Sequence, residues 1–218
     1  MKTKICVIGA GLGGLSAGIR LANKGFEVDL YEQNSTHGGK AGEIKEMGYR
    51  FDTGPSLLTM PQVIKDLFSE CGENIDDYLS INRLELICKY FYPDGSILNA
   101  YSDQDKFGKE IDEKTSDNSD SLDKYLTYCK TIYELAGDLF LTKDPSSIST
   151  YLNSKALKTL LNVGKIDPFR TINKANESFF KDQRLVQLFN RYATYNGSNP
   201  YLAPATLNII PHVEYNQG

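Results

Sequence analysis

A glycine-rich turn between two apolar segments constrains the fold of this chain more than any other feature. Residues 9–14 read Gly-Ala-Gly-Leu-Gly-Gly and satisfy the pattern G-x-G-x-x-G. The turn follows an apolar run rich in branched side chains at residues 4–8, which predicts a strand buried on both faces. A helical pattern at residues 12–23 and a second strand at residues 28–32 come next. Together these segments predict a βαβ unit whose two strands run parallel.

These glycines suit the binding of a diphosphate. The first permits a tight turn, the second lets a pyrophosphate approach the backbone, and the third lets helix and strand pack closely. The amides and the positive dipole end of the helix then attract the anion. Glu32 lies eighteen residues after Gly14, where a carboxylate can accept a hydrogen bond from a ribose hydroxyl, with a plain surface charge as the alternative. The predicted dinucleotide site consists of Gly9, Ala10, Gly11, Gly13, Gly14 and Glu32.

The rest of the chain changes from strands to helices. Two hairpins are predicted, at residues 42–52 and at residues 82–101. Residues 103–123 are rich in aspartate and glutamate, which favours a solvated helix and its linker over an acidic binding function. Apolar residues at helical spacing predict further helices at residues 61–71, 122–140, 155–163 and 183–193.

Composition limits the classes of function. The formal net charge of -4 and the pI near 5.3 leave no basic surplus for phosphate backbones, so we expect no nucleic-acid partner. The four cysteines are far apart and only two histidines are present, so neither a disulfide framework nor a metal site is indicated. Five glycines interrupt the apolar run at residues 5–19, which argues against a secretory signal. No window approaches the roughly 20 apolar residues that span a bilayer.

The segments after Glu32 separate this chain from a nicotinamide dehydrogenase, which would continue the βαβ alternation. Residues 37–42 read His-Gly-Gly-Lys-Ala-Gly, and residues 51–56 read Phe-Asp-Thr-Gly-Pro-Ser. Both motifs resemble those of the flavoprotein family that includes amine oxidases and carotenoid desaturases, and the resemblance implies FAD as the cofactor. Lys40 stands where the family commonly has arginine, and a lysine keeps the charge but loses the planar fork. The residues implied to line the FAD are Gly39 and Lys40 near the phosphates, and Gly54, Pro55 and Ser56 toward the flavin ring.

Longer stretches resemble bacterial phytoene desaturases and related carotenoid desaturases. The later ones most resemble the branch that acts on hydroxylated carotenoids at the 3,4 bond, with a general phytoene desaturase as the alternative. The implied fold class is α/β: a Rossmann-like FAD-binding βαβ unit of the glutathione-reductase-like type, a hairpin layer and a helical region. Members of the family continue past Gly218, so the resemblance implies an incomplete N-terminal fragment that is inactive alone. The matching stretches are residues 48–61, 92–95, 189–201 and 203–206.

We therefore expect four segments along the chain. Residues 1–80 form the N-terminal part of the FAD-binding domain, and residues 81–102 form a hairpin of the substrate domain. Residues 103–200 form a helical region that faces substrate or membrane, and residues 201–218 begin the return to the substrate and FAD domains. The candidates for a membrane-facing surface, with interior packing as the alternative for each, are Tyr133, Leu139, Phe140 and Leu141.

The resemblance implies a FAD-dependent oxidoreductase of carotenoid biosynthesis. It would form a carbon-carbon double bond in phytoene or a hydroxylated carotenoid by hydride transfer to the flavin, with a quinone or oxygen as electron acceptor. Its lipophilic substrate implies a cytoplasmic protein that touches the inner face of the cell membrane peripherally. No catalytic residue is assigned, because a structural role is favoured for His212, a lone histidine beside a proline. A flavin amine oxidase and a non-catalytic FAD-binding module are the alternatives.

Overall fold

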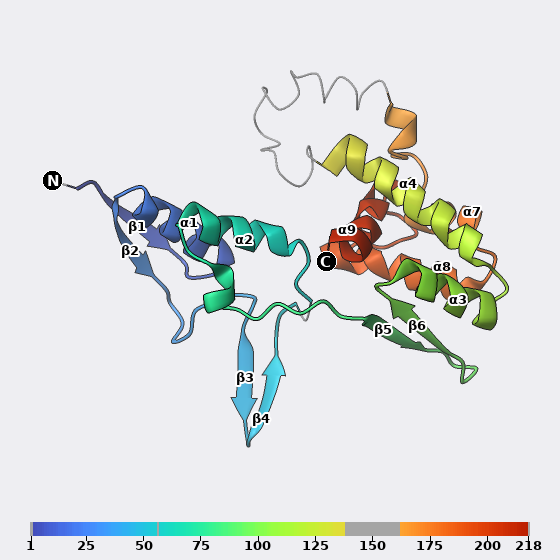
Figure 1. Ribbon diagram of the computed structural model, residues 1–218, viewed down its shortest axis with the longest axis horizontal. Coiled ribbons are helices and arrows are strands. Elements are labelled where there is room, and N and C mark those ends of the chain that lie inside the picture. The colour runs from blue at the N-terminus through green and yellow to red at the C-terminus, as the bar shows by residue number, and fades with distance from the viewer. Residues whose placement is uncertain (1, 56, 138–161, 218) are drawn as a thin grey trace. The chain divides into compact units, whose positions relative to one another are not determined.

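The computed structural model describes residues 2–55, 57–137 and 162–217 (Figure 1). The chain divides into two compact units, one ending at Asn82 and the other running from Arg83 to Gln217. Within the described ranges, the strands form two small sheets in the first unit and one in the second. Each unit is built around its own packing between helices and strands.

The first unit begins with the predicted βαβ arrangement. β1 (Lys4–Ile8) and β2 (Glu27–Tyr31) pair in parallel, and α1 (Leu12–Asn23) connects them. The helix ends where Gly25 adopts a φ of +89°, a left-handed conformation that suits glycine. The prediction of a parallel pair is confirmed, with β2 one residue earlier than expected. Glu32 therefore follows the strand instead of closing it.

The expectation that β1 is buried on both faces is wrong. Val7 packs against Gly14 of α1, whereas Ile8 points away and is 87% exposed. α1 packs on one face of this sheet, which has two strands in the described part of the chain. Because successive side chains of a strand point to opposite faces, alternate residues of β1 stay exposed.

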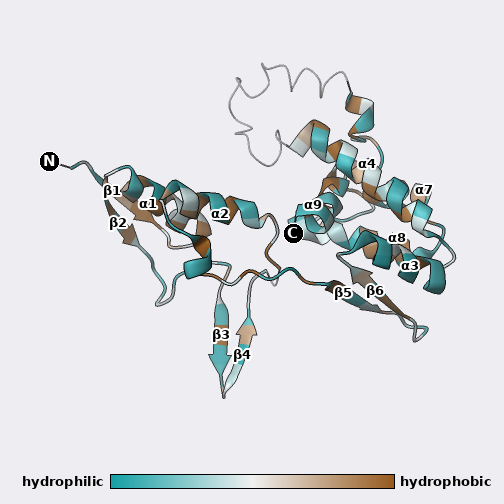
Figure 2. Cartoon of the chain, in the orientation of Figure 1, coloured by the Kyte–Doolittle hydropathy of each residue, from teal (hydrophilic) through white to brown (hydrophobic). Residues whose placement is uncertain are grey.

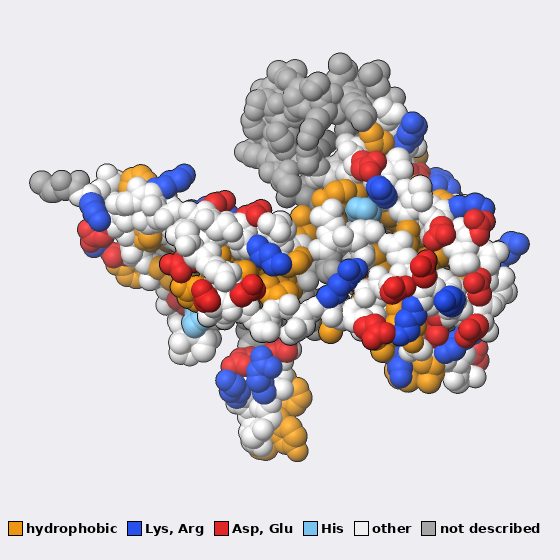
Figure 3. All heavy atoms as spheres, in the orientation of Figure 1, with side chains coloured by type: hydrophobic (Ala, Val, Ile, Leu, Met, Phe, Trp, Pro, Cys, Tyr) orange, Lys and Arg blue, Asp and Glu red, His pale blue; other side chains and the backbone are white. Residues whose placement is uncertain are grey.

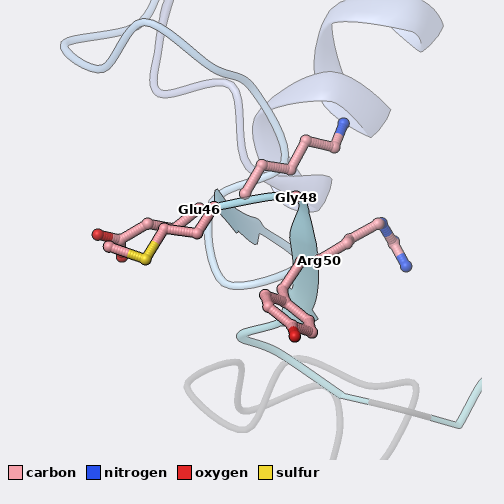
Figure 4. A pocket seen from close by; sticks show the side chains of 6 residues that line it. Glu46, Gly48 and Arg50 are labelled. Atoms are coloured by element: carbon pink, nitrogen blue, oxygen red, sulfur yellow. The ribbon is translucent and has the colours of Figure 1, made fainter.

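β3 (Glu43–Glu46) and β4 (Tyr49–Asp52) form the first predicted hairpin. Met47 and Gly48 make its turn with φ of +51° and +83°, as two-residue hairpin turns require. Charged and hydrophobic side chains are separated on this hairpin (Figure 3). A hollow of about 300 Å³ is lined by residues 45–50 alone (Figure 4). Since every lining residue belongs to the hairpin itself, the hollow is a local feature of the turn.

A helix and a short 3-10 turn follow the hairpin. α2 (Pro61–Glu70) starts with proline at its first position and precedes Gly72, whose φ is +75°, so the predicted helix is confirmed. The 3-10 turn is η1 (Ile75–Asp77). Arg20 of α1 pairs with Glu70 at 2.7 Å, which links α1 to α2.

The second unit starts with the second predicted hairpin. β5 (Leu86–Phe91) and β6 (Ile97–Tyr101) pair antiparallel, and Gly95 in their turn has a φ of +82°. The predicted helices near residues 122–140 and 183–193 are also found. The helical elements are α3 (Gln104–Lys114), α4 (Ser119–Gly137), η3 (Val163–Lys165), α7 (Ile172–Phe179), α8 (Gln183–Asn190), η4 (Arg191–Asn196), η5 (Ala205–Asn208) and α9 (Ile209–Gln217).

The core of the second unit forms around α4. Its apolar residues recur every three or four positions and are buried, as predicted (Figure 2). The ring of Tyr125 lies 4.3 Å from that of Phe189 and 5.5 Å from that of Phe179. Phe180 stacks on Phe189 at 4.9 Å. Each buried large apolar side chain contributes roughly 1.5–3 kcal/mol, so this aromatic cluster contributes substantially to the unit's stability.

The expectation of a solvated helix at residues 103–123 needs correction. α3 packs against β6 and α4, and its Phe107 and Ile111 are fully buried. Glu110 is buried as well, where it accepts hydrogen bonds from Asn99 and pairs with Lys114 at 2.8 Å. Acidic residues dominate the composition of the segment, but the two apolar side chains four positions apart place one face of α3 in the core.

Several predictions fall outside the described residues. These concern nearly all of the helix at 155–163, the end of the helix at 122–140, and three of the four membrane candidates. The remaining candidate, Tyr133, is half-buried in α4 and donates its hydroxyl hydrogen bond to Gln217 at 3.2 Å. Across residues 2–137 and 162–217, no helix combines the length and apolarity that crossing a membrane requires.

Asp182 caps α8, and its replacement by alanine should lower the free energy of unfolding by about 2 kcal/mol at pH 7. Its carboxylate accepts hydrogen bonds from the Arg184 side chain and from the backbone N–H groups of Arg184 and Ser116. The hydrogen bond from Arg184 is the main cause that lowers the pKa of Asp182 to about 2. A carboxyl group with a depressed pKa stabilises the fold above its unfolded pKa, so this contribution should disappear as the pH falls from about 4 to 2.

Urea titrations at pH 7 and pH 3 measure this effect. Asp103→Ala is the control, because Asp103 caps α3 through the N–H of Lys106 at an exposed position and should cost only about 1 kcal/mol. Equal losses for the two variants at pH 7 would contradict the assignment of an additional ion-pair contribution to Asp182.

Candidate functional site

The glycine turn lies at the N-terminus of α1 and exposes its backbone. Gly9 has a φ of +99°, and its N–H bonds to Tyr31 O at 2.7 Å. Gly11 is the N-cap and supplies no side chain to the amides of the first turn, which have no partner inside the helix. A Cβ on Gly9 or Gly13 would meet no atom within 4 Å among the described residues. No side chain therefore blocks access to the backbone of the turn, and the N-terminus of α1 is available to bind an anion.

Gly14 has a different role from Gly13. A Cβ on Gly14 would overlap the Gly9 carbonyl oxygen, because their separation would be much shorter than any contact that Cβ atoms normally make. The start of α1 therefore rests directly on the end of β1. This is the close helix–strand packing that the third glycine of the motif permits.

Glu32 contacts the glycine turn directly. Its Oε2 accepts a hydrogen bond from Ala10 N at 2.8 Å, and its Oε1 accepts from the backbone and side-chain nitrogens of Asn34 at 3.0 and 2.8 Å. The hydrogen bonds from Asn34 and then from Ala10 lower the pKa of Glu32. The group is therefore an anion at neutral pH. A carboxylate has about four acceptor positions, so three protein donors leave room for a further one.

A second glycine-rich loop lies against this turn. Gly38 N bonds to Ala10 O at 2.8 Å, and Gly38 forms an isolated bridge with Gly11. Gly39, at a φ of +60°, approaches so closely that its Cβ would lie 3.1 Å from Gly11 Cα. The positive φ and the close contact at Gly39 both favour glycine at that position.

The segment after β4 completes this arrangement. Thr53 N bonds to Gly42 O at 3.0 Å, and a Cβ on Gly54 would overlap the carbonyl oxygen of Lys40. Backbone contacts therefore bring the turn, the second glycine loop and this segment together. Lys40 and Pro55 are both exposed. Ser56 lies outside the described residues.

Sequence reasoning missed the residues that hold these segments in place. Asn34 donates twice to Glu32, and Gly38 joins the second loop to the turn. Thr53 bonds back to Gly42. The doublet Gly38-Gly39 was a readable signal, because two adjacent glycines commonly mark close backbone approach. Asn34 carried no comparable signal in the sequence.

His212 is buried in α9, where its ring lies 4.7 Å from that of Tyr133 and its Nδ1 contacts Asn216 at 3.2 Å. Burial lowers its pKa, so the imidazole is neutral at pH 7. Across the described ranges, no group of three or more His, Cys, Asp or Glu side chains could hold a metal ion.

Comparison with known proteins bears on this site and on the whole chain. Residues 7–71 match the family model of the NAD(P)-binding Rossmann-like domain. The chain is 38% identical over 215 residues to a 1-hydroxycarotenoid 3,4-desaturase of Flavobacterium sp., covering 99% of this chain and 44% of that protein. It is 35% identical to a 4,4'-diapolycopene oxygenase of Methylomonas sp., covering 99% and 43%. A 4,4'-diaponeurosporene oxygenase of Staphylococcus haemolyticus is 34% identical, covering 100% and 43%. The chain thus spans less than half the length of these curated relatives.

Solved structures agree on the fold. A putrescine oxidase bound to putrescine superposes with a TM-score of 0.58 at 13% identity, covering 98% of this chain and 44% of that one. An oxidoreductase from Methanosarcina mazei superposes with a TM-score of 0.50 at 15% identity, covering 99% and 44%. The predicted α/β fold with a Rossmann-like unit is confirmed. Residues 7–71 are thus similar to a Rossmann-like NAD(P)-binding domain, and nearly the whole chain is similar in sequence to a carotenoid desaturase and to carotenoid oxygenases.

Proposed function

We propose that the candidate site of the first unit binds FAD. The open backbone around Gly11 and Gly13 suits a diphosphate, because a helix N-terminus attracts anions and no side chain blocks the approach. Glu32 retains an acceptor position toward a ribose hydroxyl, and its negative charge disfavours a 2′-phosphate at that place. The same proposal assigns Gly39 and Lys40 to the phosphates, and Gly54, Pro55 and Ser56 to the neighbourhood of the flavin.

When bound, FAD supplies a flavin that accepts a hydride from carbon. The residues of this chain bind and orient the cofactor. Glu32 fixes the glycine turn through Ala10 and the following loop through Asn34, so the amides of the turn are preorganised before any ligand arrives. Residues 1–80 then serve as the N-terminal part of a cofactor domain, and the segments from residue 81 onward contribute to substrate binding.

We propose further that the protein is an oxidoreductase that introduces carbon-carbon double bonds into a carotenoid. Identity of 38% to a 1-hydroxycarotenoid 3,4-desaturase along nearly the whole chain carries this proposal. Desaturases and oxygenases are both oxidoreductases, so the relatives agree on redox chemistry while differing in the reaction. A hydroxylated carotenoid is the proposed substrate and phytoene the second choice. A quinone or oxygen would accept the electrons, and the lipophilic substrate would be taken up at a membrane surface.

Absorbance spectroscopy tests the reaction. The protein is loaded with FAD and mixed with liposomes that contain phytoene or a hydroxylated carotenoid. Because each new double bond lengthens the conjugated system, desaturation should move the absorbance to longer wavelength. Hydrogen peroxide production from putrescine, with no change in the polyene spectrum, would instead support an amine oxidase. A protein that binds FAD and is reduced by neither substrate would support a non-catalytic module.

Replacement of Glu32 by glutamine should weaken FAD binding about tenfold, because a hydrogen bond to a charged acceptor contributes roughly 1.5–3 kcal/mol. Quenching of flavin fluorescence on titration with the protein measures the affinity. Glu27→Gln is the matched control, since Glu27 lies at the start of β2, is exposed, and faces Lys4 at 3.6 Å. Equal affinities for the two variants would remove Glu32 from the proposed site.

A further inference from the structure

A polar cluster lies inside the second unit, where η4, α9 and β5 supply its members. Glu214 of α9 is only 5% exposed and accepts hydrogen bonds from Tyr192 Oη at 2.6 Å, from Arg191 Nη2 at 3.1 Å and from the hydroxyl of Tyr195. The Arg191 guanidinium lies 4.5 Å from the ring centroid of Tyr192. The members of the cluster are Tyr90, Arg191, Tyr192, Tyr195, Glu214 and Tyr215.

Three polar atoms of this cluster are buried without a hydrogen-bond partner among the described residues. They are Tyr90 Oη, Arg191 Nε and Tyr215 Oη. The groups lie close together: the Arg191 guanidinium is 5.8 Å from the ring centroid of Tyr90, and the ring of Tyr215 is 6.4 Å from that of Tyr192. An unpartnered buried polar group costs roughly 1–3 kcal/mol, so three in one place call for an external partner.

The charges of the cluster select the kind of partner. Glu214 already neutralises Arg191, so an anion would gain little from the guanidinium and would face the carboxylate. The groups without a hydrogen-bond partner are one N–H donor and two hydroxyls. Each hydroxyl can donate or accept a hydrogen bond. A neutral hydroxyl group satisfies them best, because it accepts from Arg191 Nε and exchanges hydrogen bonds with a tyrosine.

Aromatic rings surround these unpartnered polar groups. Tyr215 stacks on Phe107 at 5.7 Å, and Tyr192 stacks on Phe189 at 6.2 Å. The cluster nevertheless reaches the surface of its unit, since the Arg191 side chain is 30% exposed and Tyr195 is 44% exposed. A hydroxyl carried on a long apolar molecule would match both the unsatisfied polar atoms and the aromatic rings around them.

We propose that this polar cluster binds the hydroxyl group of an otherwise apolar substrate and thereby sets the preference for hydroxylated over hydrocarbon polyenes. The inference deepens the proposed carotenoid function and rests on it for the identity of the substrate. Tyr90, Arg191 and Tyr215 act as specificity residues here. They accept or donate a hydrogen bond that only the hydroxylated ligand can complete, and a hydrocarbon leaves them unpaired.

Binding measurements on isosteric variants test the proposal. The probes are a long polyene with one hydroxyl near its end and the same polyene without it, both in detergent micelles, with tyrosine fluorescence quenching as readout. The wild-type protein should bind the hydroxylated probe about tenfold more tightly, which corresponds to one net hydrogen bond. Tyr90→Phe and Tyr215→Phe should each lose most of this preference while the melting temperature stays unchanged, because neither hydroxyl has a protein partner to lose.

Tyr92→Phe is the matched control, since the hydroxyl of Tyr92 donates to Arg184 O at 2.8 Å. This variant should melt at a lower temperature and keep the preference. A wild-type protein without preference, or a preference that survives in both orphan-hydroxyl variants, would overturn the inference and leave these atoms to ordered water only. Turnover of the same probes is followed in parallel. Preferential binding without any spectral change of the polyene would refute the proposed reaction and leave the site intact.

Discussion

Replacement of Glu214 by alanine should lower the free energy of unfolding by about 3 kcal/mol. The carboxylate is buried and accepts hydrogen bonds from two tyrosine hydroxyls and one guanidinium. Its removal leaves Arg191 as an uncompensated charge beside groups that already lack partners. Breaking one side of a buried ion pair costs roughly 3–5 kcal/mol, and the partial exposure of Arg191 favours the lower end of that range.

Urea denaturation of three proteins measures this effect. Glu134→Ala is the control, because Glu134 on α4 pairs with Lys130 at 3.8 Å with both side chains more than half exposed. Such surface pairs contribute roughly 0–1 kcal/mol. Glu214→Gln retains an acceptor for Tyr192 and should fall between the two alanine variants. A loss for Glu214→Ala no greater than that for Glu134→Ala would mean that water, and not the carboxylate, satisfies the cluster.

The polar cluster could not have been read from the sequence, in contrast to the βαβ unit. β1, α1 and β2 follow one another within 31 residues, and each carries a local signal in glycine placement or apolar spacing. Tyr90, Arg191 and Glu214 lie far apart in the chain and have no local pattern. Tertiary packing of η4 against α9 brings two of them together, and periodicity carries no information on such contacts.

Errors in the sequence reading also have physical causes. Acidic composition at residues 103–123 concealed Phe107 and Ile111, whose spacing of four residues marks a buried face. The apolar run of β1 predicted burial on both faces, which requires more cover than the described residues supply to this sheet. At residues 103–123 the composition of the segment was a weaker guide than the spacing of its apolar side chains.

The candidate dinucleotide site was readable because its parts are backbone features. Glycine at four of six positions in the turn encodes close approach, and a second glycine doublet encodes the loop that packs on it. The detail that Glu32 holds the turn through Ala10 was not encoded in any pattern. This hydrogen bond implies that the carboxylate stabilises the turn itself as well as any bound ribose, so the loss of the carboxylate should affect both folding and binding.

Replacement of Gly14 by alanine should lower the free energy of unfolding by about 3 kcal/mol, as much as Glu214→Ala. It should also abolish FAD binding at micromolar cofactor. The added Cβ would overlap the Gly9 carbonyl oxygen, which belongs to backbone and cannot rotate away as a side chain would. Either α1 lifts from β1 or the turn changes its conformation. Both movements displace the amides that are proposed to face the diphosphate.

Gly13→Ala is the matched control, because Gly13 is the adjacent residue in the same turn of α1. A Cβ there meets no atom within 4 Å of the described structure, and alanine is favoured over glycine in a helix by roughly 1 kcal/mol. Circular dichroism melting should therefore show Gly13→Ala at or above the wild-type temperature and Gly14→Ala well below it. Because both variants add one methyl group to neighbouring glycines, equal melting temperatures would mean that the close contact between α1 and the end of β1 does not determine the stability of this unit.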